Sequence, residues 1–181
     1  MCRTIRLFVI SILITVGGCR DNPAGAEESP LKGILFINEF LASNRSVNAD
    51  EQGDYEDWIE LYNAGEIDVN LGGMYLTDNF TQCARWIIPD TVIPAGGFLL
   101  FWADNEVTEG PLHTNFKLNA SNGEELGLYD REVQGLLLID SISFNTQQRD
   151  TSYGHYPDGK NSWQFFSTPT PGKANKGRRG R

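Results

Sequence analysis

The sequence contains little of what several protein classes need. Its 181 residues include three cysteines and two histidines, too few for a disulfide-rich scaffold or for a metal site built from several histidines. Charged residues make up 22% and hydrophobic residues 40%, a balance that excludes a wholly disordered chain. Neither a Walker loop nor a Gly-x-Ser-x-Gly elbow is present, so nucleotide-binding and hydrolase functions lack a local motif. The length fits one domain of ordinary size.

The N-terminus has the layout of a secretory signal. Arg3 and Arg6 precede an almost purely apolar run over residues 7–16, which is a basic segment followed by a hydrophobic one. The run is shorter than the roughly 20 apolar residues that span a bilayer core. It ends in Val16-Gly17-Gly18-Cys19.

Small residues before a cysteine resemble the lipobox of bacterial lipoproteins. In that family the chain is cut before the cysteine, which is then lipidated, and Cys19 matches this position. The resemblance implies a signal peptide over residues 1–18, a lipid anchor with a flexible linker over 19–32, and location in the bacterial cell envelope. The absence of aspartate after Cys19 favours an outer over an inner membrane if the cell is Gram-negative. An ordinary signal peptide with an incidental cysteine is the alternative.

Processing at this position also affects the thiols. Cleavage removes Cys2 and lipidation blocks Cys19. We therefore expect Cys83 to have no partner for an intrachain disulfide in the processed chain.

From about residue 33, short apolar runs alternate with Gly, Pro and Asn turn residues, and no long window shows a helical period. This pattern predicts eight to ten short strands of an all-β sandwich or barrel. Residues 98–102 (FLLFW) are apolar on both faces, which predicts a buried central strand. The predicted strands cover residues 34–41, 57–63, 69–77 with a bend at Gly72-Gly73, 85–88, 97–103, 115–118, 124–130, 136–144, 152–156 and 163–166.

Seven segments in order resemble the bacterial lamin tail domain, an immunoglobulin-like β-sandwich. They are residues 37–44 (INEFLASN), 57–63 (DWIELYN), 73–78 (GMYLTD), 93–100 (IPAGGFLL), 113–118 (HTNFKL), 152–159 (SYGHYPDG) and 168–175 (TPTPGKAN).

The resemblance implies a lamin tail domain over residues 33–175, followed by a basic tail over 176–181. Resemblance to a family of this kind predicts the fold more reliably than the activity. It has no catalytic residues, so none are assigned here. We therefore expect a protein that is not an enzyme.

An acidic run enters the second predicted strand, and its members are Asp50, Glu51, Asp54, Glu56 and Asp57. Calcium prefers six to eight oxygen ligands, but the spacing does not match an EF-hand loop. The interpretation we favour is a solvated loop that discourages edge-to-edge aggregation. Calcium binding and paired acid–base carboxylates are the alternatives.

The histidines and tryptophans favour structural roles. His113 and His155 have no cluster of further ligands nearby in sequence, so we expect them to make structural hydrogen bonds. Aromatic residues on strands are more often core than a carbohydrate-stacking platform. This applies to Trp58, Trp86, Trp102 and Trp163.

The sequence thus assigns no catalytic, cofactor-binding or metal-ligating residue. It predicts a non-catalytic, lipid-anchored module that presents a lamin-tail β-sandwich to an envelope protein or glycan. A calcium-assisted carbohydrate-binding module and a small envelope hydrolase are alternatives. Nucleic acid is not an expected partner, because 24 acidic residues against 15 basic ones repel polyanions.

Overall fold

The chain forms eleven strands and no helix over the residues that the computed structural model describes, 28–131 and 135–177. The strands are β1 (Leu35–Leu41), β2 (Trp58–Asn63), β3 (Val69–Asn70), β4 (Tyr75–Thr77), β5 (Trp86–Ile87), β6 (Val92–Ile93), β7 (Phe98–Trp102), β8 (Glu124–Tyr129), β9 (Leu138–Phe144), β10 (Ser152–His155) and β11 (Trp163–Phe166).

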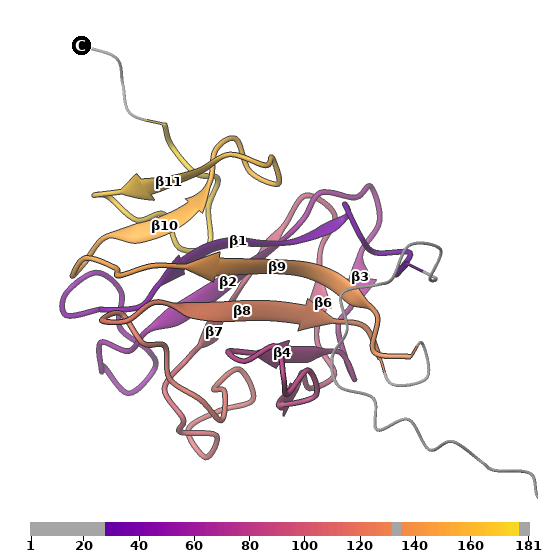
Figure 1. The fold of residues 1–181 in the computed structure, drawn as a ribbon, viewed down its shortest axis with the longest axis horizontal. Coiled ribbons are helices and arrows are strands. Elements are labelled where there is room, and N and C mark those ends of the chain that lie inside the picture. Colours follow the sequence, from indigo (N-terminus) through magenta and orange to yellow (C-terminus); the bar gives the residue numbers. More distant parts are fainter. Residues whose placement is uncertain (1–27, 132–134, 178–181) are drawn as a thin grey trace, which may run out of the picture.

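Two antiparallel sheets pack face to face, with β8 and β9 lying over β1 (Figure 1). The five-stranded sheet has the order β11-β10-β1-β2-β7, and the four-stranded sheet has the order β5-β4-β8-β9. Strands β3 and β6 form a separate pair. This architecture confirms the predicted all-β, immunoglobulin-like sandwich.

The core between the sheets follows the alternation read from the sequence. Leu35 and Ile37 of β1 and Ile59 and Leu61 of β2 are fully buried and point inward. Leu126 of β8 faces them from the other sheet. Alternation therefore places one apolar row of each strand between the sheets.

A β-bulge in β1 changes which residues point inward. The pairing of β1 with β2 shifts register between Ile37 and Glu39, so Asn38 is an extra residue in the strand. Before the bulge Ile37 points into the core, and after it Phe40 does. One extra residue inverts the alternation, and Glu39 therefore faces outward.

The outer face of the five-stranded sheet carries three rows of side chains. Register pairs Leu41 with Trp58 and Trp58 with Trp102 in the first row. In the middle row Glu39 pairs with Glu60, which also pairs with Leu100 of β7. The third row joins Phe36, Tyr62 and Phe98. This face is thus divided into an apolar, an acidic and an aromatic row.

Four details of the sequence prediction were wrong. Strand β7 is an edge strand of its sheet. Both faces of β7 are apolar because one packs into the core and the other forms part of the outer-face cluster of Leu41, Trp58 and Trp102.

Residues 115–118 form no strand; Lys117 makes only an isolated bridge, to Asp104. Residues 69–77 split at Gly72-Gly73 into β3 and β4, which belong to different sheets. Strand β6 was missed because its two residues are too few to show a period.

The domain begins earlier than residue 33. Ser29 is buried and its hydroxyl donates to Asp130 Oδ2 at 2.6 Å, and Leu31 packs against the core. The flexible linker is therefore shorter than the predicted range, which ended at residue 32. The sequence analysis missed this because a contact between residues so distant in the chain leaves no local signal.

The turn at Asn122-Gly123, which precedes β8, provides a test of the fold. Gly123 has φ +74°, and a Cβ there would lie 2.3 Å from the Phe144 carbonyl oxygen. Gly96 has φ +64° but open space around it. We expect Gly123→Ala to lower the free energy of unfolding by about 3 kcal/mol or more, and Gly96→Ala by about 1 kcal/mol. Urea unfolding measures both, and equal losses would contradict the steric account.

Candidate functional site

The C-terminal segment, residues 167–177, crosses the outer face of the five-stranded sheet and is held by its acidic row. Glu39 accepts hydrogen bonds from the Ser152 hydroxyl and from the backbone N–H of Thr170, at 3.2 and 3.3 Å for its two oxygens. The Thr170 hydroxyl also donates to Glu39 Oε2 at 3.0 Å. Glu60 Oε2 accepts the backbone N–H of Gly172 at 2.5 Å.

Burial changes the protonation of this row. Both glutamates are fully buried. Loss of solvation raises the pKa of Glu60 to about 8, and the neighbouring Glu39 adds to this. Burial also raises the pKa of Glu39, against the hydrogen bonds it accepts. Glu60 is therefore largely protonated at neutral pH, which limits repulsion between the two side chains.

A polar network fixes the end of the segment. Asn175 donates its backbone N–H to Asp158 Oδ1 at 3.0 Å and its side-chain amide to the His155 carbonyl at 2.7 Å. The Asn38 amide, at the bulge, donates to the same Asp158 oxygen at 3.0 Å. The bulge, the hairpin from β10 to β11 and the C-terminal segment are thus bonded together.

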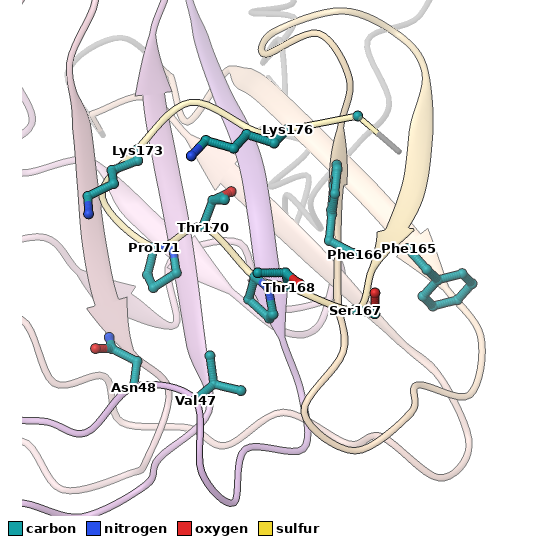
Figure 2. A pocket seen from close by; sticks show the side chains of 12 residues that line it. Val47, Asn48, Phe165, Phe166, Ser167, Thr168, Thr170, Pro171, Lys173 and Lys176 are labelled. Carbon is teal, nitrogen blue, oxygen red and sulfur yellow. The ribbon is translucent and has the colours of Figure 1, made fainter. Parts of the chain in front are cut away.

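The segment forms one wall of a groove of about 640 Å³, hereafter the C-terminal groove (Figure 2). Val47 and Asn48, from the loop after β1, line it together with Phe165, Pro171, Lys173 and Lys176. Phe165 is exposed, as are both lysines. The groove therefore combines apolar surface with positive charge on a chain of formal net charge −9.

A second group of polar residues lies where the loops after β1 and β7 meet. The cluster of Leu41, Trp58 and Trp102 packs together at these strand ends. Asp104 follows β7 directly; its Oδ1 accepts the Glu106 N–H at 2.9 Å and its Oδ2 bonds His113 Nδ1. Both Asp104 and the His113 ring are buried.

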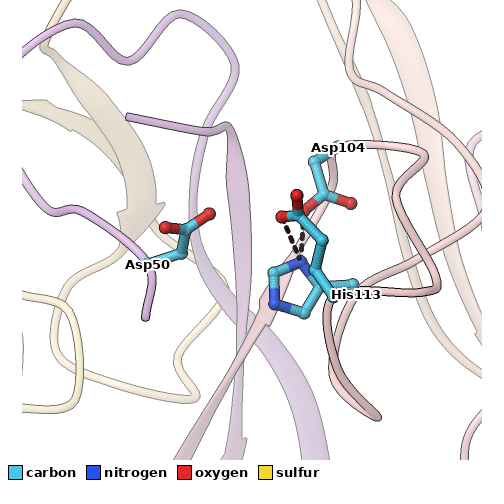
Figure 3. A group of neighbouring side chains, drawn as sticks. Asp50, Asp104 and His113 are labelled. Atoms are coloured by element: carbon cyan, nitrogen blue, oxygen red, sulfur yellow. Dashed lines mark hydrogen bonds and ion pairs between the residues drawn. The ribbon is translucent and has the colours of Figure 1, made fainter. Parts of the chain in front are cut away.

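Asp50 approaches this pair from the other loop (Figure 3). Its Oδ1 accepts the backbone N–H groups of Gln52, Gly53 and Asp54, each at 2.9 Å. Its Oδ2 is buried and has no hydrogen-bond partner.

Ligand-type atoms of four residues lie within 4.8 Å of one another, and we call this group the loop-end cluster. Its members are Asp50, Asp104, Glu109 and His113. A fifth charged residue, Glu51, places its Oε2 3.6 Å from His113 Nε2.

Burial and neighbouring carboxylates shift the pKa values of His113 and Glu109 in the loop-end cluster. Burial lowers the pKa of His113, but Asp104 and Glu51 outweigh it, so the pKa is raised above its usual 6.5. Desolvation raises the pKa of Glu109, and the negative charges of Glu106 and Asp50 raise it further. The cluster thus gathers negative charge around one imidazole.

The acidic run of the sequence does not form a site of its own. Asp50 belongs to the loop-end cluster and Glu51 lies beside it, with its Oε2 3.6 Å from His113 Nε2. Glu56 lies 3.6 Å from Lys117 Nζ. Asp57 accepts the Asn44 N–H at 3.0 Å, and burial raises its pKa to about 6. The sequence missed Asp104, Glu109 and His113 as neighbours of Asp50, because more than 50 residues separate the two loops.

Both histidines make the hydrogen bonds expected of them, and most tryptophans are buried as expected. His113 bonds Asp104, and His155 Nδ1 bonds the Lys160 carbonyl. Three tryptophans are buried, and the partly buried Trp163 packs on Tyr153 with ring centroids 5.3 Å apart. The buried ones are Trp58, Trp86 and Trp102.

Cys19, the predicted lipid attachment site, lies outside the described residues. Cys83 is disulfide-bonded in the chain that still carries residues 1–18. The expectation that Cys83 has no disulfide partner concerns the processed chain, from which Cys2 is removed and in which Cys19 is acylated, and it stays a prediction for that form.

Comparison with known families gives the class of protein. The model of the lamin tail domain matches residues 28–146, and the chain belongs to this family. The family is a non-enzymatic, immunoglobulin-like domain that often mediates interactions. The sheet extends past the matched range, since β10 and β11 pair onto β1.

Searches of curated proteins and of solved structures found no match. Across the described residues, no helix is long and apolar enough to cross a membrane.

The buried acidic row predicts an unusual pH dependence of stability. The pKa of Glu60 is raised from 4.5 to about 8 in the folded chain, so the folded state holds a proton that the unfolded state releases. We expect the free energy of unfolding to fall as pH rises from 4.5 to 8, by up to about 4 kcal/mol from this group. Urea unfolding at pH 5, 6.5 and 8 measures the slope.

Two variants separate the contribution of Glu60 from the titration of other carboxyl groups. Glu60→Gln keeps an oxygen for the Gly172 N–H and should make the slope shallower; Glu124, whose pKa is raised to about 7, and Asp57 and Asp140, at about 6, still contribute. Glu66→Gln removes an exposed glutamate and should leave the slope unchanged. A Glu60→Gln variant with the slope of the original chain would contradict the buried proton.

Proposed function

We propose that this chain is a non-catalytic interaction module, tethered to the bacterial cell envelope through a lipid on Cys19. The tether rests on the lipobox-like residues before Cys19. Several acyl chains on one cysteine would give firm anchoring where a single chain is marginal. A module held at a surface gains avidity for extended partners without a tight single site.

The C-terminal groove is the observation that carries the binding role. It places Pro171 and the exposed Phe165 beside Lys173 and Lys176. Exposed aromatic side chains supply contact area at interfaces, and the lysines select against other basic surfaces. The partner that fits is an extended protein segment with apolar and acidic side chains. An envelope glycan is the alternative, since Phe165 also offers a face for stacking on a sugar.

Lipidation of Cys19 is tested by metabolic labelling with an alkyne fatty acid. We expect the chain to be labelled, to begin at residue 19, and to fractionate with membranes. Cys19→Ala should lose the label and the membrane fraction, while Cys83→Ala keeps both. A cleaved and unlabelled chain that is released from the cells would show an ordinary signal peptide instead.

Binding at the groove is tested by site-specific photo-cross-linking in the native host. A photoreactive residue at position 165 should capture one discrete partner. The same residue at position 87, on β5 of the other sheet and 56% exposed in the chain, should not. The double variant Lys173→Glu, Lys176→Glu should abolish the cross-link at 165. Equal capture from both positions, or capture that survives the charge reversal, would argue against the groove.

A further inference from the structure

We propose that Asp50, Asp104, Glu109 and His113 bind one divalent transition-metal ion, of the zinc or manganese type. The four residues each offer one ligand atom, and these atoms lie within 4.8 Å of one another. Ligands of one ion at about 2.0–2.2 Å lie some 3 to 4 Å apart. Small side-chain movements therefore bring the group to coordination distance.

The Asp50 side chain provides an independent observation. Three backbone N–H groups hold its Oδ1 at 2.9 Å each, so the carboxylate is fixed in orientation. Its Oδ2 is buried without a hydrogen-bond partner. A buried, unpaired carboxylate oxygen is costly, and a bound cation at the cluster satisfies it.

The other ligands are also held in place. Asp104 is fully buried and uses Oδ1 to accept the Glu106 N–H at 2.9 Å, which leaves Oδ2 directed at His113. Glu109 Oε2 lies 3.9 Å from His113 Nδ1. The Gln52 amide donates to the Glu109 carbonyl at 3.2 Å and so ties the two loops together. The fold has therefore fixed much of the ligand geometry in advance.

The set of donor atoms selects the class of metal. Three carboxylates place negative charge next to one imidazole, which attracts a divalent cation. Calcium and magnesium prefer oxygen ligands throughout, whereas imidazole suits zinc and other first-row transition metals. The ion proposed here thus differs from the calcium considered as an alternative at the acidic run, and Asp50 binds it with partners from the loop after β7. Binding would join the loops after β1 and β7 at one end of the sandwich.

Isothermal titration of the metal-free, purified full chain in detergent micelles tests this site, with ZnCl2, MnCl2 and CaCl2 as probes. We expect one zinc or manganese ion per chain, bound at least tenfold more tightly than calcium. Asp50→Asn keeps an oxygen for the three N–H donors and removes the Oδ2 ligand, so it should weaken binding tenfold or more. Asp54→Asn, a charge change in the same loop, should bind within twofold of the original chain.

Histidine ring signals in NMR spectra give a second measurement that does not depend on the Asp50 variant. Zinc should shift the signals that are lost in His113→Gln and leave those lost in His155→Gln in place. Absence of binding heat, tighter binding of calcium, unchanged binding by Asp50→Asn, or a shift of the His155 signals would each overturn the proposal.

Discussion

The hydrogen bonds between the buried carboxylates of Glu39 and Glu60 and the backbone of residues 170–172 hold one wall of the C-terminal groove against the sheet. Burial of two neighbouring glutamates is tolerated because each has donors and because the raised pKa of Glu60 allows it to stay neutral. Without these bonds, residues 170–172 would lose their contacts with the sheet, and the groove wall before Lys173 would be held only by the network around Asn175. Stability and the proposed binding groove therefore depend on the same pair of side chains.

That pair exists because of the bulge at Asn38. In a regular strand Glu39 would follow Leu35 and Ile37 into the hydrophobic core. The extra residue turns it outward, next to Glu60. It also returns Phe40 to the core, where its ring contacts that of Phe144 with centroids 4.5 Å apart. One inserted residue thus serves the core and the outer face together.

The sequence predicted most of the fold, because alternation and turn residues are local signals. In β2, alternation along the sequence places Ile59 and Leu61 on the face that packs into the core, with Trp58, Glu60 and Tyr62 on the other. The position of a strand within its sheet depends on pairing between distant segments. The local apolar pattern of β7 therefore led to the wrong prediction of a central strand. Both candidate sites are assembled from distant segments, Val47 with Lys173 in one and Asp50 with His113 in the other. No spacing along the chain could reveal them.

The position of the last strands has a consequence for biogenesis. Strands β10 and β11 pair onto β1, the first strand, so the first strand to leave the ribosome or a translocation channel needs the last ones to complete its sheet. Such long-range pairing slows folding and leaves the open edge of β1 available to other extended chains until synthesis ends. A chaperone that masks this edge would therefore be needed most by the nascent chain and least by the finished protein.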